Sequence, residues 1–184
     1  MKKALSKLIL LNILGWRIEG DVPKEKKYLI VVAPHTSNFD FIIGILARNV
    51  MGFNPKYLAK DSLFKFPFGY FFKALGGYPV DRSRRSNMVE QVIDIYNAEE
   101  EFIITVAPEG TRGLSEKWKT GFYHIALGAN IPVVLVYFDY GKKVVHFANA
   151  HYVDPDKEKE MQKIYNFYRG VEAAKPENFK IPQA

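Results

Sequence analysis

The stretch Ala33-Pro34-His35-Thr36-Ser37-Asn38-Phe39-Asp40-Phe41 sets the expected fold, because it places a base and a carboxylate directly after an apolar strand. Before it, residues 28–32 form a short β-branched run that is typical of a buried strand. After it, residues 41–46 are apolar and predict a helix. His35 is therefore expected at a strand-to-helix turn, at the carboxyl end of a strand, where α/β proteins commonly assemble their sites.

The spacing of His35 and Asp40 admits two interpretations. On one continuous helix, side chains five residues apart would point about 140° away from each other. A helix that begins after His35, with Ser37 as its N-cap, would instead turn Asp40 back toward the preceding loop as the acidic partner of a capping box. Asp40 then either only caps the helix, or it also fixes the tautomer of a His35 that accepts a proton from a hydroxyl group.

Composition limits the possible chemistry. The 184 residues, 48% hydrophobic and 15% aromatic, are enough for one domain over residues 1–184 with a substantial core. The absence of cysteine excludes disulfides, thiolate nucleophiles and thiolate metal sites. A net charge of +6 implies an acidic partner, such as phosphate, anionic lipid or nucleic acid. His146 and His151 have no carboxylate or third ligand at metal-binding spacing, so we expect no metal site.

The N-terminal segment, residues 1–16, alternates lysines with leucines and isoleucines and predicts an amphipathic helix. It is too short to span a bilayer, which needs about twenty apolar residues, and no small-residue cleavage site follows before Arg17. It either packs on the body of the protein or lies in a membrane interface with its lysines toward the headgroups.

Strands and helices are expected to alternate through the rest of the chain. The aromatic stretch 64–73, interrupted by Pro67 and Gly69, forms either core or a surface for acyl chains or the bilayer. The C-terminal segment from Lys175 is expected to be a loose tail. Strands are expected at residues 56–60, 78–82, 102–106, 131–138 and 144–147, and helices at residues 88–97 and 156–169.

A second polar cluster, Glu109-Gly110-Thr111-Arg112, follows the expected strand at residues 102–106. Gly110 permits a tight turn, and Thr111 offers a hydroxyl group. Arg112 offers a planar fork for a phosphate, and Glu109 would hold that arginine or bind an acceptor.

Four segments together resemble the glycerolipid acyltransferases, most closely the lysophosphatidic acid acyltransferase branch. They are His35-x4-Asp40, then Gly-Tyr-Pro-Val-Asp-Arg at 77–82, Pro-Glu-Gly-Thr-Arg at 108–112 and Ile-Pro-Val-Val at 131–134. Their order and spacing carry the resemblance, since each segment alone is a weaker signal. The resemblance implies an α/β sandwich with a mixed, largely parallel sheet flanked by helices.

The resemblance also implies the roles of the site residues. His35 would be the general base, oriented by Asp40, and no covalent enzyme intermediate or cofactor is needed. The donor would be a thioester of acyl carrier protein or coenzyme A, and the acceptor a lysophospholipid such as lysophosphatidic acid. The protein would contact the cytoplasmic face of a membrane peripherally. The acceptor and its phosphate would be bound by Arg82, Glu109, Gly110, Thr111 and Arg112.

Two departures from the family pattern leave the acceptor open. Thr36 to Phe39 stand where many members have a basic residue and a bulky pair, and Gly113 stands where serine is frequent. Another lyso-lipid, such as a lyso-aminolipid, is therefore an alternative acceptor, and a catalytically silent lipid-binding protein would share the fold. The chain has no nucleic-acid recognition motif, so we expect no nucleic-acid partner.

Overall fold

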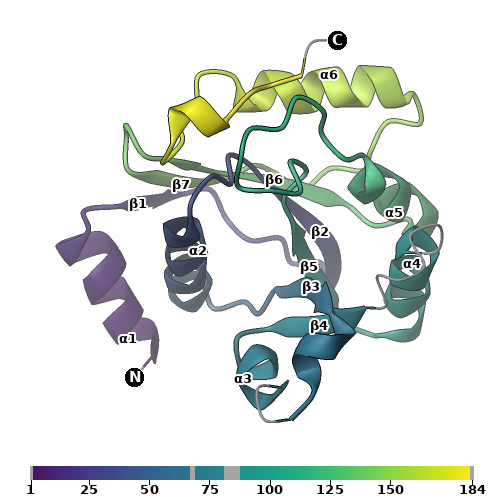
Figure 1. The fold of residues 1–184 in the computed structure, drawn as a ribbon, viewed down its shortest axis with the longest axis horizontal. Helices are drawn as coiled ribbons and strands as arrows, with labels where there is room; N and C mark the ends of the chain where they lie inside the picture. Colours follow the sequence, from purple (N-terminus) through teal and green to yellow (C-terminus); the bar gives the residue numbers. More distant parts are fainter. Residues whose placement is uncertain (1, 67–68, 81–87, 183–184) are drawn as a thin grey trace.

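The computed structural model describes residues 2–66, 69–80 and 88–182. It is an α/β sandwich built on a seven-stranded sheet in the order β1-β7-β6-β2-β5-β3-β4 (Figure 1). The strands are β1 (Arg17–Glu19), β2 (Lys27–Val32), β3 (Lys56–Lys60), β4 (Gly77–Val80), β5 (Phe102–Val106), β6 (Val133–Asp139) and β7 (Val144–Phe147). Among the strand pairings of the described residues, only β6–β7 is antiparallel, so the expected mixed, largely parallel sheet is confirmed.

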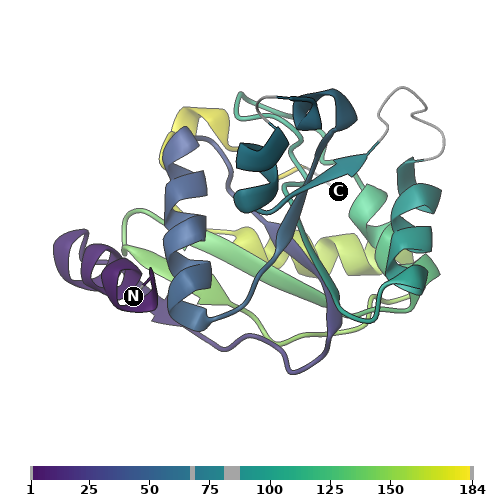
Figure 2. The same ribbon diagram turned by 90° about the horizontal axis from the view of Figure 1, so that it is seen from below.

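Helices cover both faces of this sheet, and Figure 2 shows α2 and α4 on opposite sides of it. The α-helices are α1 (Lys2–Lys7), α2 (Asn38–Met51), α3 (Gly69–Ala74), α4 (Met88–Ala98), α5 (Gly121–Ala129) and α6 (Lys157–Tyr168). Shorter helical turns are η1 (Leu8–Ile13), η2 (Asp61–Phe64) and η4 (Pro176–Asn178). Every strand and helix expected from the sequence is present, whereas the three-residue strand β1 was not predicted.

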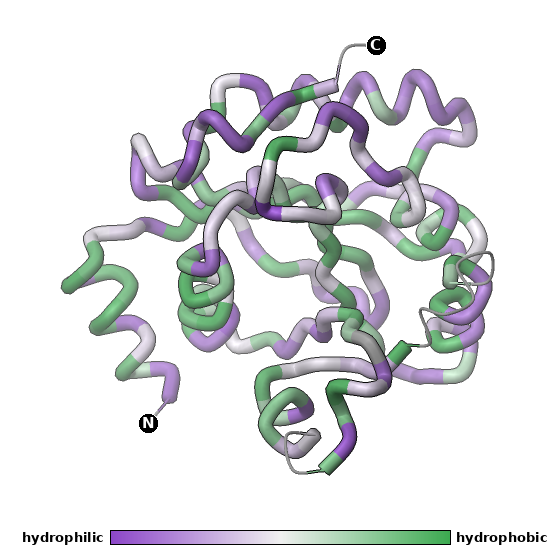
Figure 3. Tube along the Cα trace, in the orientation of Figure 1, coloured by the Kyte–Doolittle hydropathy of each residue, from purple (hydrophilic) through white to green (hydrophobic). Residues whose placement is uncertain are grey.

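The central strand β2 divides the core into two layers, because successive side chains on a strand point to opposite faces. Leu29 and Val31 belong to the cluster under α4, α5 and α6. Ile30 and Val32 belong to the cluster under α2 and the N-terminal segment. Both faces are buried, which explains why β2 reads as a continuous apolar run. Figure 3 shows the same pattern, with hydrophobic central strands and more polar peripheral segments.

The N-terminal segment is helical over residues 2–13, as expected, and it packs against α2 through a buried Leu10. Asn49 of α2 donates a hydrogen bond to the Ser6 hydroxyl at 3.0 Å. Three further apolar side chains of the N-terminal segment, Leu5, Leu8 and Ile13, are exposed. Part of the apolar face therefore contacts the body and part faces solvent. No helix of the described residues is long and apolar enough to cross a membrane.

The C-terminal segment is not the loose tail that the sequence suggested. Its Lys175 amide donates to the Thr36 hydroxyl at 3.1 Å, and the Trp118 indole donates to the Lys180 carbonyl at 3.2 Å. Phe179 and Ile181 pack against the core. Two aromatic or aliphatic anchors and backbone hydrogen bonds thus tie this segment to the body, close to the loop that carries His35.

Candidate active site

Three neighbouring parallel strands, β6, β2 and β5, end at the same edge of the sheet. The loop after β2 carries His35, and the loop after β5 carries Glu109. Tyr140 follows directly after β6. The sheet therefore brings together residues that lie up to 105 positions apart in the sequence, from His35 to Tyr140.

Helix α2 begins with the capping box that the sequence predicts. The Ser37 hydroxyl accepts a hydrogen bond from the Phe39 amide at 3.1 Å, and Asp40 Oδ2 accepts one from the Ser37 amide at 2.8 Å. These bonds satisfy amides at the helix N-terminus that have no partner within the helix. They also turn the Asp40 carboxylate toward the loop that contains His35.

His35 and Asp40 form a direct pair. Nδ1 of His35 lies 3.2 Å from Oδ2 of Asp40, whose side chain is almost fully buried while the imidazole is 22% exposed. Burial would raise the pKa of Asp40, but hydrogen bonds from His35, Tyr140 and the Ser37 amide outweigh it and lower that pKa below its usual value. Asp40 is therefore a carboxylate at neutral pH, which favours the tautomer of His35 that carries its proton on Nδ1. Both interpretations of Asp40 thus describe the same geometry, since it caps the helix and orients the histidine.

Glu109 lies beneath His35 and is only 4% exposed. Its Oε2 accepts a hydrogen bond from the His35 amide at 2.8 Å, while its buried Oε1 has no partner among the described residues. Burial raises the pKa of Glu109 to about 7, opposed by the His35 amide and reinforced by the charge of Asp40. The structure therefore places Glu109 against the backbone of the histidine loop.

The turn after Glu109 forms a small polar cavity of about 440 Å³ beside His35. Gly110 has φ +67°, and a Cβ there would collide with the side chain of Lys119. Thr111 and Arg112 are exposed, and no ion pair in the described part of the chain involves Arg112. A free guanidinium in a glycine-rich turn suits a phosphate, which it can bind through two parallel hydrogen bonds.

A larger and mainly apolar cavity of about 620 Å³ also borders His35. Phe41, Gly44 and Ile45 of α2 line one wall, and Phe71 and Phe72 of α3 line another. His35, Ala107 and Arg112 line both this cavity and the polar one. The imidazole therefore stands where an apolar cavity meets a polar one.

Two further residues were singled out in the sequence, Arg82 and Thr36. Arg82 lies outside the described residues, so its predicted contact with the acceptor has no structural counterpart here. Thr36, whose departure from the family pattern raised the question of a different acceptor, is buried and bonds the C-terminal segment. Thr36 lines neither of the two cavities, so the presence of threonine at this position does not change the cavity walls.

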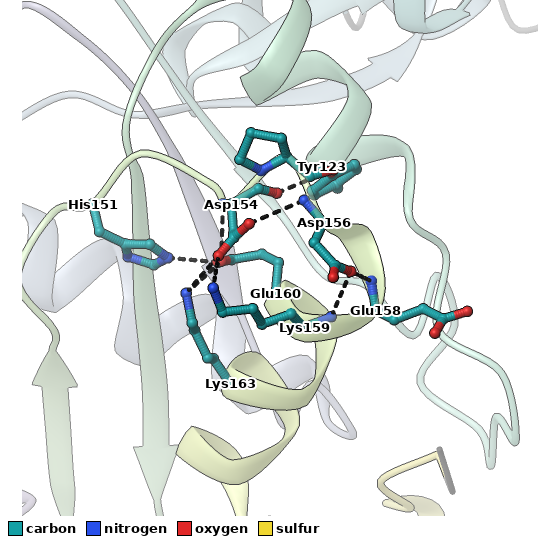
Figure 4. A network of polar contacts seen from close by, with 9 residues as sticks. Tyr123, His151, Asp154, Asp156, Glu158, Lys159, Glu160 and Lys163 are labelled. Atoms are coloured by element: carbon teal, nitrogen blue, oxygen red, sulfur yellow. Dashed lines mark hydrogen bonds and ion pairs between the residues drawn. The ribbon is translucent and has the colours of Figure 1, made fainter.

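Two polar contacts were missed from the sequence. The Tyr140 hydroxyl donates to Asp40 Oδ1 at 2.6 Å, although residues 139–142 read only as a turn. The sequence analysis considered His151 only as a metal ligand, whereas Nε2 of His151 lies 2.7 Å from Oε1 of Glu160 (Figure 4). No group of three potential metal ligands occurs within residues 2–66, 69–80 and 88–182.

Comparisons with known proteins agree with this geometry. The sequence profile of the acyltransferase family matches residues 16–139, which include the His35–Asp40 pair and the 109–112 turn. The chain therefore belongs to the acyltransferase family. The similar enzymes are named more narrowly, as acyltransferases of 1-acyl-sn-glycerol-3-phosphate.

Two such relatives are 1-acyl-sn-glycerol-3-phosphate acyltransferase epsilon of Mus musculus and 1-acyl-sn-glycerol-3-phosphate acyltransferase of Escherichia coli. The mouse protein is 34% identical over 99 residues, which cover 50% of this chain and 27% of the relative. The bacterial protein is 26% identical over 133 residues, which cover 67% of this chain and 53% of the relative. The matches thus span about half of these relatives or less.

A solved structure shares the fold. The crystal structure of the 1-acyl-sn-glycerophosphate (LPA) acyltransferase PlsC from Thermotoga maritima superposes with a TM-score of 0.61. The match covers 92% of this chain and 76% of that one, at 22% sequence identity. It supports the α/β sandwich with its mixed sheet.

Proposed function

We propose that this chain transfers a fatty acyl group from a thioester of acyl carrier protein or coenzyme A to the hydroxyl group of a lysophospholipid. Lysophosphatidic acid is the acceptor we favour. The observation that carries the proposal is the position of His35, which borders both an apolar cavity and a polar, arginine-bearing cavity. An acyl chain fits the first and a phosphate the second, so the two reacting groups would meet at the imidazole.

The reaction follows from the orientation of the imidazole. Because Nδ1 of His35 faces Asp40, its Nε2 is the nitrogen available to the acceptor hydroxyl. Nε2 removes the hydroxyl proton as the oxygen attacks the thioester carbonyl carbon. The tetrahedral intermediate then expels the thiolate, which takes the proton back from His35. The products are an ester and a free thiol, and the enzyme carries no acyl group at any stage.

The polar cavity supplies the acceptor specificity in this proposal. Arg112 is the exposed cation in the turn, and Gly110 and Thr111 shape its floor. The family resemblance assigns acceptor binding to Glu109 as well, but its burial beneath His35 favours a supporting role for that carboxyl group. Arg82 remains a proposed second phosphate ligand, on the resemblance alone.

Membrane contact is part of the same proposal. Lysophospholipids reside in bilayers, and the N-terminal segment exposes Leu5, Leu8 and Ile13 beside lysines 2, 3 and 7. Such a segment binds a lipid surface by burying its apolar side chains and placing its lysines near anionic headgroups. One domain over residues 1–184 would thus act peripherally at the cytoplasmic face of a membrane.

The test measures thiol release from acyl-coenzyme A and acyl carrier protein thioesters with three acceptors in mixed micelles, and without any acceptor. The acceptors are lysophosphatidic acid, monoacylglycerol and a lyso-aminolipid. We expect release that depends on lysophosphatidic acid, with a KM for this acceptor raised roughly tenfold in Arg112→Ala, the loss of about one charge-assisted contact. Lys117→Ala, on the same loop but lining neither cavity, is the matched control.

Two results would contradict the proposal. Equal release with monoacylglycerol, unaffected by Arg112→Ala, would remove the phosphate from the recognition step. No release with any donor and acceptor pair, from a folded protein, would favour the catalytically silent lipid-binding alternative.

A further inference from the structure

Tyr140 is the one hydrogen-bond donor to Oδ1 of Asp40 within the described residues, at 2.6 Å. The other carboxylate oxygen, Oδ2, faces Nδ1 of His35 at 3.2 Å and accepts from the amides of Thr36 and Ser37 at 2.9 and 2.8 Å. Three contacts thus converge on one oxygen and a single contact on the other. A carboxylate is planar, so a donor on Oδ1 limits its rotation about the Cβ–Cγ bond.

Tyr140 is itself held from two sides. Its ring meets the ring of the buried Trp16 edge to face, with centroids 5.0 Å apart. Its backbone amide donates to the Glu172 carbonyl at 2.9 Å. The N-terminal segment and the loop after α6 therefore fix the position of the phenol, and neither contact depends on the substrate.

We propose that Tyr140 is a positioning residue, which locks the Asp40 carboxylate in the rotation that presents Oδ2 to His35. This inference rests on the proposed role of His35 as the base. The phenol acts through Asp40 and lines neither cavity, so it does not touch the substrate in this account. It was not visible in the sequence motifs, because it lies 100 residues after Asp40 and outside all four of them.

The electrostatics of the pair are consistent with this role. Burial, and then the hydrogen bond to Asp40, raise the pKa of Tyr140 well above its ordinary value, so the phenol is a donor at every pH at which the enzyme would be assayed. Short hydrogen bonds to an ionised acceptor are roughly twice as strong as neutral ones. The other charged groups around the pair are Glu109, which faces it from the loop after β5, and Arg112, which shares the cavity walls with His35.

Removal of the phenol oxygen should have a specific signature. In Tyr140→Phe the Asp40 carboxylate loses the donor that limits its rotation, so Oδ2 is held less firmly against Nδ1 of His35. A histidine that is oriented less firmly is a poorer base at the same substrate affinity. The activity should therefore fall in kcat and not in KM.

The experiment compares wild type, Tyr140→Phe and Tyr123→Phe in the thiol-release assay between pH 5 and 9. Phe keeps the ring against Trp16, so folding should be preserved. Tyr123→Phe is the matched control, since its hydroxyl bonds only the carbonyls of Asp154 and Pro155, away from the site. For Tyr140→Phe we expect kcat to fall roughly tenfold, with the KM for donor and acceptor unchanged. Tyr123→Phe should leave all of these at the wild-type values.

A second measurement does not depend on turnover. The proton on Nδ1 of His35 should give a downfield NMR signal that shifts in Tyr140→Phe and stays in place in Tyr123→Phe. Wild-type kcat, or a loss of activity with an unmoved proton signal, would overturn the inference. If His35→Ala retains wild-type turnover, the proposed function fails instead. If His35→Ala loses turnover but Tyr140→Phe keeps the wild-type values, only the inference on Tyr140 fails.

Discussion

Two histidine–carboxylate pairs in this molecule look alike and sit in different surroundings. In each, a histidine in a loop or strand end meets a buried carboxylate in the first turn of a helix, Asp40 in α2 and Glu160 in α6. Each carboxylate also accepts a backbone amide, from Ser37 in one case and Asp154 in the other. The two pairs differ in what lies beyond the histidine.

The His151–Glu160 pair is the tighter contact, 2.7 Å against 3.2 Å for His35–Asp40 (Figure 4). Glu160 is completely buried, and Lys163 and the amide of Asp154 surround its second oxygen. His151 lines neither cavity, and its backbone pairs with Val133. This pair joins α6 to the first residue of β6, so we interpret it as structural.

The His35–Asp40 pair has a looser contact but a chemically useful position. His35 lines both the apolar and the polar cavity, and its second ring nitrogen has no bond to another described residue. A close pair with a buried carboxylate is therefore not in itself evidence of catalysis. Access from the histidine to a cavity that can hold a substrate distinguishes the two sites.

The largest expected effect comes from exchanging each carboxylate for its amide. Asp40→Asn should lower acyl transfer roughly 1,000-fold, because the amide neither fixes the tautomer of His35 nor stabilises its protonated form. Glu160→Gln should leave acyl transfer within about twofold at 20 °C, since it lies away from both cavities. The rate of thiol release at saturating donor and acceptor concentrations measures the activity of both variants.

The same two variants should show the opposite order in stability. Glu160→Gln leaves fewer acceptor oxygens for His151, Lys163 and the amide of Asp154, and should cost about 2 kcal/mol, or roughly 5 °C in Tm. Asp40→Asn keeps one oxygen for the capping box and should cost less. Thermal unfolding measures the stability of both variants. Equal losses of activity in the two variants would contradict the distinction between the two pairs.

A smaller effect concerns pH and Glu109. Its pKa is about 7 in the folded protein against an ordinary value of 4.5, chiefly because of burial. The folded state therefore binds more protons than the unfolded state between these values, and the contribution of Glu109 to stability falls as pH rises from about 4.5 to 7. The loss amounts to at most about 3 kcal/mol.

Glu109→Gln tests this directly, since glutamine keeps an acceptor for the His35 amide and cannot ionise. Urea unfolding at pH 5 and pH 8 should show a smaller decrease in stability with pH for the variant than for wild type. Glu158→Gln, an exposed carboxylate in α6, should keep the wild-type slope. Identical slopes in wild type and Glu109→Gln would show that the carboxyl group is not held neutral by burial.

Much of this arrangement could be predicted from local sequence. The Ser37–Asp40 capping box is encoded within four residues, so the start of α2 and the return of Asp40 toward His35 followed directly. The strands follow from apolar runs, and the ordered motifs indicated the family. These features depend on neighbours in the chain, whose geometry is set by the backbone.

Two of the contacts that were missed depend on distant partners. Tyr140 meets Asp40 across 100 residues, and Lys175 meets Thr36 across 139. The third, between His151 and Glu160, spans only nine residues, but it depends on how α6 packs beside β6. The burial of Glu109 was missed for the same reason, since it follows from the pairing of β2 with β5. Sequence patterns identify the motif residues, whereas the sheet order determines which of them support one another.

The central claim is that His35, and not His151, is the base of an acyl transfer. The most direct test measures acceptor-dependent thiol release by wild type, His35→Ala and His151→Ala, with acceptor binding measured separately for each protein. We predict that His35→Ala loses at least about 1,000-fold in turnover and binds the acceptor normally, while His151→Ala keeps near-wild-type turnover. Near-normal turnover of a correctly folded His35→Ala would contradict the account.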